Sequence, residues 1–490
     1  MQEAKRQFQI PEEVSAISRA LSSRGFENYL VGGSVRDLIR KDPPTGGPKD
    51  WDIATSATPE EIQKVFPDSF YENQFGTVGV KTESIGIVEV TPYRLESEYS
   101  DARHPDKIAW AKTIEEDLAR RDFTINALAH NIETGDLIDP FEGEADIEKK
   151  LIRTVGNPDE RFNEDALRMF RALRFASELN FAIELETQAA ITKNAELLAK
   201  VSKERIRDEL IKIIISDHPA LALDLAARLG ILKFISPEFE KGIGMEQNQA
   251  HAYTVWEHLL RSLDHAAKKD YPLHVRLASF FHDVGKPHTR DRRNDQWTFY
   301  GHEVVGAKLT RNILADLKFP KELSEKVIKL VRWHMFFSDP DKITLSAVRR
   351  IVRNVGPEMI WDLVNLRVCD RIGTGRPKET PFRLRKYKSM IEEVLRDPIS
   401  VKQLAVDGED VMKLTETSGG PHVGFILEIL LSEVLADPKL NSEDYLEKRI
   451  KELYSLSPEE LSKLGREARA NNEGEEEKEI AAIREEYKVQ

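Results

Sequence analysis

The stretch KDWDIATSATPEEI, residues 49–62, places two aspartates, Asp50 and Asp52, two positions apart with Trp51 between them. Apolar residues follow, and the Thr-Pro-Glu-Glu that comes next is typical of the capped start of a helix. We therefore predict a strand over DWDIAT and a helix over TPEEIQKVF. Because alternate residues of a strand face the same side of a sheet, we expect the two carboxylates to point together.

Two interpretations of this aspartate pair are open. On their own, acids spaced in this way occur most often on surface strands or at helix caps. Two neighbouring carboxylates also repel each other, and the repulsion is relieved when they share a divalent cation. Magnesium suits such a site because it takes oxygen ligands and leaves positions open for phosphate groups.

The neighbouring segments favour the metal site. NYLVGGSVRD, residues 28–37, predicts a strand, a Gly-Gly turn and a helix. Backbone N–H groups of Gly32 and Gly33, together with Arg36, can hold a triphosphate at such a turn, although the motif alone equally fits a plain tight turn. FGTVGVKT and IGIVEVTPYR predict two further strands, and Glu89 on the second is either a third carboxylate of the site or an exposed strand acid.

RRDFTINALA, residues 120–129, predicts a helical run that begins after Arg120, Arg121 and Asp122. These charged residues are either a solvated helix start or a phosphate clamp, since arginine presents a fork of donors that matches phosphate oxygens.

Beyond about Asn157 the apolar spacing becomes helical. In RFNEDALRMFRALRF, Glu164 and Asp165 are predicted to share a helical face with Arg168. One interpretation is exposed ion pairs. The other is a template for a nucleobase, because a carboxylate accepts a hydrogen bond from the exocyclic amine of cytosine or adenine while an arginine donates to the neighbouring acceptor. Further residues expected on this helical ridge or in its support are Arg161, Arg171, Arg174, Arg205, Glu209 and Lys212.

Six His and Asp residues form a second candidate site. Each follows an apolar helical run, so any one of them alone is best explained as a semi-buried residue with satisfied hydrogen bonds. As a set, imidazole and carboxylate groups suit Mn, Fe, Ni, Co or Zn. The residues are His258, His282, Asp283, His302, His334 and Asp370.

Composition limits the class of protein. At 490 residues the chain exceeds what one hydrophobic core usually supports, and 40% hydrophobic residues fit a globular, helix-rich protein. The single cysteine, Cys369, excludes an internal disulfide framework. Since no apolar run approaches the about 20 residues that span a bilayer, we expect a cytoplasmic protein. A net charge of −13 argues against coating of nucleic acid by bulk charge but permits a local basic track.

Four segments in a fixed order, LVGGSVRD, KDWDIATSATPEEI, EEDLARRDFTINALA and EDALRMFRALRFA, resemble the class II tRNA nucleotidyltransferase and bacterial poly(A) polymerase family of the polymerase-β-like superfamily. The resemblance implies two-metal nucleotidyl transfer with Mg²⁺ at Asp50 and Asp52. It implies catalytic roles for Asp50, Asp52 and Glu89, and nucleotide-binding roles for Gly32, Gly33, Arg36, Arg121, Asp122, Asp165, Arg168, Arg171 and Arg174.

The second set of residues, taken in order, resembles the HD phosphohydrolase pattern. Lys286, in HDVGK, would then assist phosphate binding. The resemblance implies a metal-dependent phosphohydrolase acting on RNA ends. His258, His282, Asp283 and Asp370 match the core ligands, and His302 and His334 match the additional histidines of members that hold two metals.

The fold implied is an α/β polymerase-β-like nucleotidyltransferase head followed by an all-α neck and body that includes an HD-type helical domain. We expect the head over residues 1–155, a helical neck with the nucleobase template over 156–235, the HD-type domain over 236–375, a C-terminal helical tRNA-binding module over 376–456 and an acidic tail over 457–490.

The resemblance further implies addition of C, C and A from CTP and ATP to the 3′ end of tRNA. ESEYSDARHPDKIAW, residues 96–110, resembles the flexible loop that the family uses for the terminal A, and the acidic end of the chain differs from the basic tail typical of the family's poly(A) polymerases. Two alternatives are an A-adding tRNA nucleotidyltransferase or poly(A) polymerase, and mainly a metal-dependent HD phosphohydrolase with an RNA-binding head.

Overall fold

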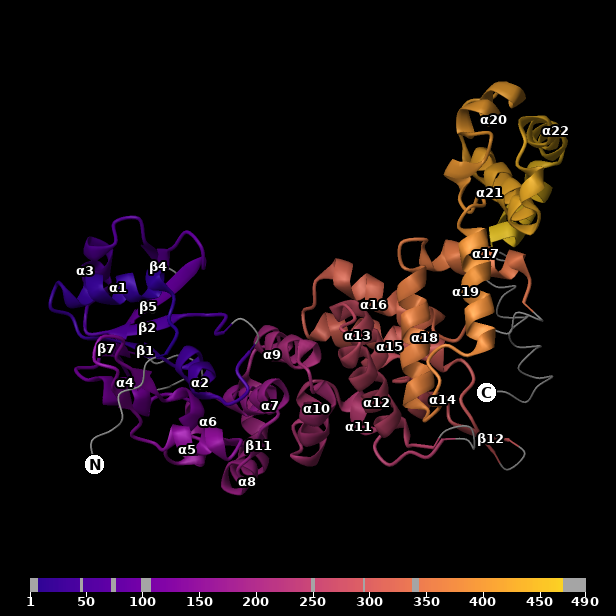
Figure 1. The fold of residues 1–490 in the computed structure, drawn as a ribbon. Coiled ribbons are helices and arrows are strands. Elements are labelled where there is room, and N and C mark those ends of the chain that lie inside the picture. The colour runs from indigo at the N-terminus through magenta and orange to yellow at the C-terminus, as the bar shows by residue number, and fades with distance from the viewer. Residues whose placement is uncertain are drawn as a thin grey trace. The chain divides into compact units, whose positions relative to one another are not determined.

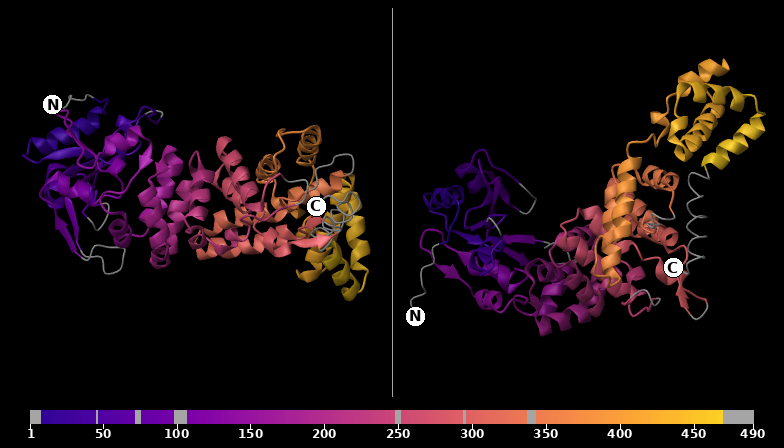
Figure 2. Two further views of the ribbon diagram at one scale, coloured as in Figure 1. Left: turned by 90° about the horizontal axis from the view of Figure 1, so that it is seen from below. Right: turned by 45° about the vertical axis from the view of Figure 1, so that its right-hand side comes forward.

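The structure is a computed structural model that describes residues 8–44, 47–71, 76–97, 107–247, 252–293, 296–336 and 343–469. Contacts divide the chain into two compact units, Met1–Pro237 and Glu238–Gln490. The strands of the main sheet belong to the indigo and magenta part of the chain (Figure 1), and helices make up most of the second unit (Figure 2). Within the described ranges, no helix has the length and apolar character needed to cross a membrane.

A mixed sheet organises the first unit. Its strand order is β3-β4-β5-β2-β1-β8-β9, and only the central pair β2 and β5 is parallel while the other pairs are antiparallel. The strands are β1 Asn28–Val31, β2 Asp52–Thr55, β3 Phe70–Tyr71, β4 Val78–Lys81, β5 Ile87–Pro92, β8 Ala129–His130 and β9 Leu137–Ile138.

Short strand pairs accompany this sheet. A separate hairpin flanks the segment that resembles the family's flexible loop; residues 98–106 of that segment lie outside the described residues. The pairs are β6 Arg94–Ser97 with β7 Lys107–Trp110, β10 Leu151–Ile152 with β11 Ala182–Ile183, and, in the second unit, β12 Asp291–Arg293 with β13 Gln296–Thr298.

Local sequence signals explain the helices next to the sheet. The Thr58 hydroxyl accepts from the Glu61 N–H, and the Glu61 carboxylate accepts from the Thr58 N–H at 2.8 Å, which is the predicted capping box. A core that includes Val31, Tyr93 and Leu118 packs under the sheet. The helices are α1 Glu12–Ser22, α2 Gly33–Ile39, α3 Pro59–Val65, α4 Ile114–Ala119, the 3₁₀ turn η1 Thr124–Asn126 and α5 Gly143–Glu148.

The chain then becomes helical, as the apolar spacing predicts. Two expectations are corrected here. The helical run expected after Asp122 is only the single turn η1, and the expected helix through Asp165 is interrupted, because α6 ends at Glu164 and α7 begins at Arg168. The helices are α6 Pro158–Glu164, α7 Arg168–Leu179, α8 Leu185–Asn194, η2 Ala195–Lys200, α9 Lys203–Ile215, α10 Pro219–Arg228 and η3 Leu232–Phe234.

The second unit is almost entirely helical. Aromatic packing of Phe239 on Phe280, with ring centroids 4.3 Å apart, contributes to its core. Its elements are α11 Pro237–Glu240, α12 Val255–Lys268, α13 Leu273–Phe281, α14 Lys286–Thr289, α15 His302–Asp316, α16 Lys321–Trp333, α17 Leu345–Val355, α18 Ile360–Gly373, α19 Phe382–Val394, η4 Val401–Gln403, α20 Gly408–Thr415, α21 Pro421–Ala436, η5 Pro438–Leu440 and α22 Glu443–Tyr454.

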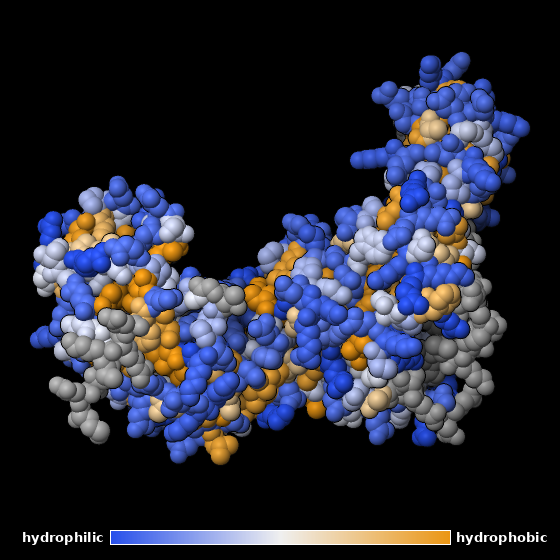
Figure 3. All heavy atoms as spheres, in the orientation of Figure 1, coloured by the Kyte–Doolittle hydropathy of each residue, from blue (hydrophilic) through white to orange (hydrophobic). Residues whose placement is uncertain are grey.

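Residues 458–469, at the start of the predicted acidic tail, are helical, and residues 470–490 lie outside the described part of the chain. The face of the molecule drawn in Figure 3 is mostly hydrophilic, with apolar residues scattered between polar ones. Scattered exposed apolar residues of this kind are normal for a globular protein.

A glycine allows two helices of the second unit to approach closely. A Cβ at Gly373, the last residue of α18, would overlap the Ser262 hydroxyl on α12 and lie 2.9 Å from Nδ1 of His258. Gly373→Ala is therefore expected to lower the free energy of unfolding by about 1–3 kcal/mol, the usual cost of overpacking, measured by urea unfolding.

Gly424→Ala is the matched control, because this glycine lies inside α21 with nothing within 4 Å of an added Cβ. It is expected to stabilise the protein slightly, by about 0.5–1 kcal/mol, through helix propensity. Equal effects of the two substitutions would contradict the close contact between α12 and α18.

Candidate active sites

A cavity of ≈ 830 Å³ lies in the first unit. Its wall is built by the turn between β1 and α2, by β2 and β5, by the segment after α4, and by α7 and α9. The structure brings every head and neck residue of the predicted site to this wall: Gly32, Gly33, Arg36, Asp50, Asp52, Glu89, Arg120, Arg121, Asp122, Asp165, Arg168, Arg171 and Arg174.

Strand pairing positions the carboxylates. Parallel pairing of β2 with β5 sets Asp52 opposite Glu89, and the Glu89 N–H donates to the Trp51 carbonyl at 3.1 Å. Trp51 is buried, while the acids on both sides of it line the cavity. The strand is shorter than predicted, since it begins at Asp52 and Asp50 precedes it. Among the described residues, the ligand atoms of Asp50, Asp52 and Glu89 do not all lie within 4.8 Å of one another. A cation shared by Asp50 and Asp52 stays a prediction.

Gly32 brings the turn after β1 against the charged wall. Its φ of 72° lies in the left-handed region that favours glycine. A Cβ here would lie 2.8 Å from Nη1 of Arg121 and 3.8 Å from Oδ2 of Asp52. Because Gly32 has no side chain, its backbone can lie close to the Arg121 guanidinium and the Asp52 carboxylate at the cavity wall.

Arg36 is buried and held by protein groups at the cavity wall. Its Nη1 donates to Asn126 Oδ1 at 2.8 Å and its Nε donates to Asp37 Oδ1 at 2.9 Å. The guanidinium carbon lies 5.5 Å from the centre of the Phe175 ring. Asn126 was not predicted, although its place four residues after Asp122 in a charged motif is a signal for a polar partner.

The paired arginines share one buried acid. Arg120 Nη2 lies 2.7 Å from Asp117 Oδ1, and Arg121 Nη2 lies 3.1 Å from Asp117 Oδ2. Burial works to raise the pKa of Asp117, but the charges of Arg121 and Arg120 outweigh it and lower the pKa. The sequence analysis missed Asp117; its spacing of three and four residues before the two arginines was the available signal.

Asp122 is buried and anchors α7 to the head. It accepts from Arg171 Nε at 2.7 Å, from the Phe123 N–H at 2.8 Å and from Asn126 Nδ2 at 3.2 Å. Burial opposes ionisation, yet Arg171 and these donors lower the pKa of Asp122 to about 2. The position is therefore an ion pair inside the wall rather than an exposed helix start.

The predicted base template sits at the break between α6 and α7. Asp165 Oδ2 accepts from Arg205 Nη2 at 2.7 Å, and its Oδ1 accepts from the Leu167 N–H at 3.0 Å. Arg168 Nη1 donates to Glu164 Oε2 at 2.5 Å and its Nη2 donates to the Arg120 carbonyl at 3.1 Å. The expected contact of Glu164 with Arg168 is present, whereas Asp165 is held by α9 instead of by a shared helical face.

The supporting role expected for α9 is visible in its contacts. Glu209 is buried and its Oε2 lies 3.3 Å from Arg174 Nε, while Lys212 Nζ lies 3.9 Å from Glu209 Oε1. The Arg174 guanidinium carbon lies 4.4 Å from the centre of the Phe175 ring. These contacts fix α7 against α9 behind the cavity.

The Asp122 ion pair generates a test. Asp122 has a folded pKa of about 2 against an ordinary 3.8, so it contributes stability that is present above about pH 3.8 and is lost as the pH falls through 2. Asp122→Asn is expected to destabilise the protein by roughly 3–5 kcal/mol at pH 6, because the ion pair between the buried Asp122 and the partly buried Arg171 is lost.

The difference in the free energy of unfolding between wild type and this variant should decrease by roughly 2 kcal/mol between pH 6 and a pH below 2.5. Urea unfolding at each pH measures it. Asp68→Asn, at an exposed turn residue, is the control. A difference that stays constant with pH would contradict the ion pair.

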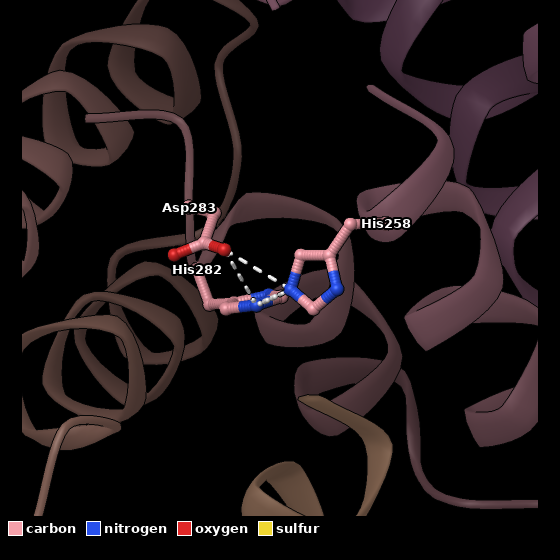
Figure 4. Close-up of side chains that lie close together, drawn as sticks. All are labelled: His258, His282 and Asp283. Carbon is pink, nitrogen blue, oxygen red and sulfur yellow. Dashed lines mark hydrogen bonds and ion pairs between the residues drawn. The ribbon is translucent and has the colours of Figure 1, made fainter. Parts of the chain in front are cut away.

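A second site lies inside the helices of the second unit. The Nε2 atoms of His258 and His282 are 2.8 Å apart, and Asp283 Oδ2 lies 3.0 Å from the first and 3.3 Å from the second. Figure 4 shows these three side chains pointing toward one another. Asp370 Oδ1, on α18, lies 3.4 Å from His258 Nε2, so four donors face one point.

The other two predicted histidines, His302 and His334, lie close to the second carboxylate oxygen of Asp283. His302, at the start of α15, and His334, just after α16, bring their Nε2 atoms to 3.3 Å. Asp283 Oδ1 lies 3.2 Å from His302 Nε2 and 3.6 Å from His334 Nε2. Two ligand groups that could each hold a metal ion therefore share Asp283.

Backbone carbonyls orient three of the four imidazoles. Nδ1 of His282, His302 and His334 lies 2.9, 2.7 and 2.7 Å from a carbonyl oxygen three residues earlier. Because a carbonyl only accepts, each Nδ1 carries the hydrogen and each Nε2 directs its lone pair at the shared centre. This second hydrogen bond is the usual way in which proteins fix a metal-binding histidine.

The buried Lys286 balances the negative charge of Asp283. Lys286 Nζ lies 2.6 Å from Asp283 Oδ2 and 2.6 Å from Gln247 Oε1, a contact that the sequence analysis missed. Burial works to raise the pKa of Asp283, but Lys286 and His282 outweigh it and hold that pKa well below its ordinary range. Burial lowers the pKa of His334 to about 4, so its imidazole is neutral near pH 7.

The chemistry of this donor set fits a transition metal, because oriented imidazole nitrogens and carboxylate oxygens are what such ions take. His258, His282, Asp283 and Asp370 would hold one ion, and His302 and His334 with Asp283 a second. The structure thus brings together all six residues expected from the sequence.

Comparison with known proteins identifies the domains of the chain. Three family models match the chain: the Poly A polymerase head domain over residues 28–153, the probable RNA and SrmB-binding site of polymerase A over 180–243, and the HD domain over 250–367. The fold and the two sites thus define a nucleotidyltransferase of the poly(A) polymerase type joined to an HD domain, which confirms the predicted α/β head and helical body.

Relatives specify the family. The chain is 44% identical over 431 residues to the CCA-adding enzyme of Geobacillus thermodenitrificans, covering 86% of this chain and 92% of the relative. It is 33% identical over 455 residues to that of Leuconostoc mesenteroides, covering 91% and 98%. The crystal structure of the Bacillus stearothermophilus CCA-adding enzyme in complex with CTP is similar with a TM-score of 0.69 and 27% identity, covering 90% and 96%. The chain belongs to the family of CCA-adding enzymes.

Proposed function

We propose that this protein adds C, C and A from CTP and ATP to the 3′ end of tRNA. One observation carries the proposal: a single cavity holds the Asp50–Asp52 pair, the Gly32 turn with its arginines, and the Asp165–Arg168 pair. Those are the three parts that nucleotidyl transfer needs, namely a carboxylate pair for cations, donors for a triphosphate and a reader for the base. The complex of the Bacillus stearothermophilus relative with CTP supports this assignment.

Different residues of the head would bind the metal ion and the triphosphate. Asp50 and Asp52 would hold Mg²⁺, which when bound polarises the phosphate and favours loss of the hydroxyl proton. Arg121, next to the Gly32 backbone, lies where it can bind the triphosphate. In the reaction the primer 3′-hydroxyl oxygen forms a bond to the α-phosphorus, the α–β anhydride bond breaks, pyrophosphate leaves and the hydroxyl proton is released.

Base selection is proposed for Asp165 and Arg168. Arg205 and the Leu167 N–H fix the Asp165 carboxylate, so that its remaining lone pairs have a defined direction for an exocyclic amine. Uracil and guanine present a carbonyl at the corresponding position, and a carboxylate repels it. Arg205 is thus a positioning residue for the template.

The test uses tRNA lacking its last three nucleotides, with CTP, ATP and Mg²⁺, followed by sequencing of the products. Wild type is expected to restore CCA, and Asp50→Asn or Asp52→Asn to lower the rate about 10²-fold or more, since charge stabilisation in the transition state is lost. Asp68→Asn, an exposed acid of the same unit, is the control.

Addition of A alone, or of long A tracts, would instead select the A-adding or polyadenylating alternatives. No addition by wild type would refute transfer and leave the alternative of an RNA-binding head. The near full-length similarity to CCA-adding enzymes favours CCA addition over both.

We also propose that the HD domain is a metal-dependent phosphohydrolase that acts on RNA ends. Its buried His and Asp cluster supports this second activity. A metal held there supplies Lewis acidity for attack of water on a phosphoester. The chain's own contribution is to orient the ligands through backbone carbonyls and to hold Lys286 beside Asp283, where its charge can receive a phosphate. The identity of the metal and the cytoplasmic location stay predictions.

Metal content tests the six-ligand cluster without relying on activity. In an Asp50→Asn, Asp52→Asn background, so that the head adds no bound ion, His302→Ala is expected to reduce the Co²⁺ or Ni²⁺ bound per chain from two to one by equilibrium dialysis and elemental analysis. His274→Ala, a histidine paired with Asp362 at 2.7 Å outside the cluster, should change nothing. Equal metal content in both variants would contradict a second ion site.

A further inference from the structure

A basic segment follows the last metal ligand of the HD domain. Between Arg367 and Lys388 the chain has eight Lys and Arg residues and two acids, in a protein whose net charge is −13. Such a local excess of positive charge in an acidic chain indicates a surface for a polyanion. The basic residues are Arg367, Arg371, Arg376, Lys378, Arg383, Arg385, Lys386 and Lys388.

Both acids of the segment have close partners of their own. Asp370 divides its oxygens: Oδ1 faces His258 Nε2 at 3.4 Å, and Oδ2 accepts from Arg367 Nη1 at 2.6 Å. Glu379 lies 2.9 Å from Lys269 Nζ and 3.8 Å from His265 Nε2. Arg367 thus orients a metal ligand, and the two acids are too few to balance the eight basic residues of the segment.

A hydrogen bond holds the segment that carries these arginines in place. The Arg371 Nε donates to the Lys378 carbonyl at 2.7 Å, which folds the segment back beside the end of α18. Positive charges on neighbouring residues repel each other, and a bound anion relieves this repulsion.

Close packing places the backbone between these arginines next to α12, the helix of the metal ligand His258. A Cβ at Gly373 would lie 2.9 Å from Nδ1 of His258, and one at Gly375 would lie 3.1 Å from Cε2 of Tyr253. On the same side the guanidinium carbon of Arg261, one turn after His258 on α12, lies 4.0 Å from the centre of the Tyr253 ring. Arg261 therefore joins the end of α18 at the His258–Asp370 side of the cluster.

We propose that Arg261, Arg371 and Arg376, here called the arginine rim, bind the phosphates next to the scissile one, so that the HD site takes the end of a single-stranded RNA rather than a mononucleotide. The inference rests on the proposed phosphohydrolase and adds the residues that select an RNA end over a mononucleotide. Arginine suits the task because its planar fork pairs with phosphate oxygens and its face stacks on bases. In the reaction a water oxygen bonds to phosphorus, the ester P–O bond breaks and the released RNA hydroxyl takes a proton.

The first test compares two substrates of the metal-loaded full chain: p-nitrophenyl phosphate, which has no second phosphate, and a five-nucleotide RNA ending in a 3′-phosphate. Arg371→Gln with Arg376→Gln is expected to lower the ratio of kcat/KM for the RNA to that for p-nitrophenyl phosphate at least tenfold, mainly through KM. The salt dependence of KM for the RNA should become shallower by about 0.7 for each arginine removed.

Arg311→Gln, an exposed arginine of α15, is the matched control, and thermal unfolding of all variants checks the fold. A ratio that changes less than twofold, or a wild type that does not prefer the RNA, overturns the inference.

A second measurement separates this inference from the phosphohydrolase itself. If neither substrate is hydrolysed with Mn²⁺, Co²⁺ or Ni²⁺, the proposed activity fails, and photo-crosslinking of RNA ending in 4-thiouridine 3′-phosphate then decides on the arginine rim. Cross-links to peptides covering residues 253–261 or 371–378 that disappear in the double variant support it. Cross-links confined to other peptides overturn it.

Discussion

Buried carboxylates of the first unit keep their charge because arginines face them, and this constraint organises the whole wall of the cavity. Asp117 faces two arginines and Asp122 faces Arg171. The partly buried Asp165 also forms an ion pair, with Arg205. An unpaired buried ion costs several kcal/mol, so each pair fixes the distance between the elements that carry its members. The segment after α4, the break between α6 and α7, and the helices α7 and α9 are thus joined by ion pairs as well as by apolar packing.

In the second unit, buried charge is balanced in a different way. Four imidazoles and two carboxylates are gathered where water is excluded, and Lys286 supplies the compensating charge. Backbone carbonyls, which are part of the helices themselves, orient the rings. Helix packing therefore sets the geometry, and the glycine at the end of α18 contributes by letting the helix of His258 approach that of Asp370.

Much of this could be predicted from the sequence, because the informative signals are local. The capping box at Thr58, the glycine turn at Gly32 and the period-two acids around Trp51 each act within a few residues. What could not be predicted depends on contacts between distant segments. The break at Asp165 violates a regular helical spacing and is stabilised by Arg205, forty residues later. Likewise Asp117 and Gln247 become recognisable as site residues only when their partners are in place.

Asp283 has a consequence for the way the two halves of the HD site communicate. Its two oxygens serve different histidine pairs, so rotation about one side-chain bond alters both halves together. By thermodynamic linkage, if a ligand in one half changes the affinity of the other half by some factor, a ligand in the other half changes the affinity of the first by the same factor. The two halves are thus structurally linked through the carboxylate of Asp283.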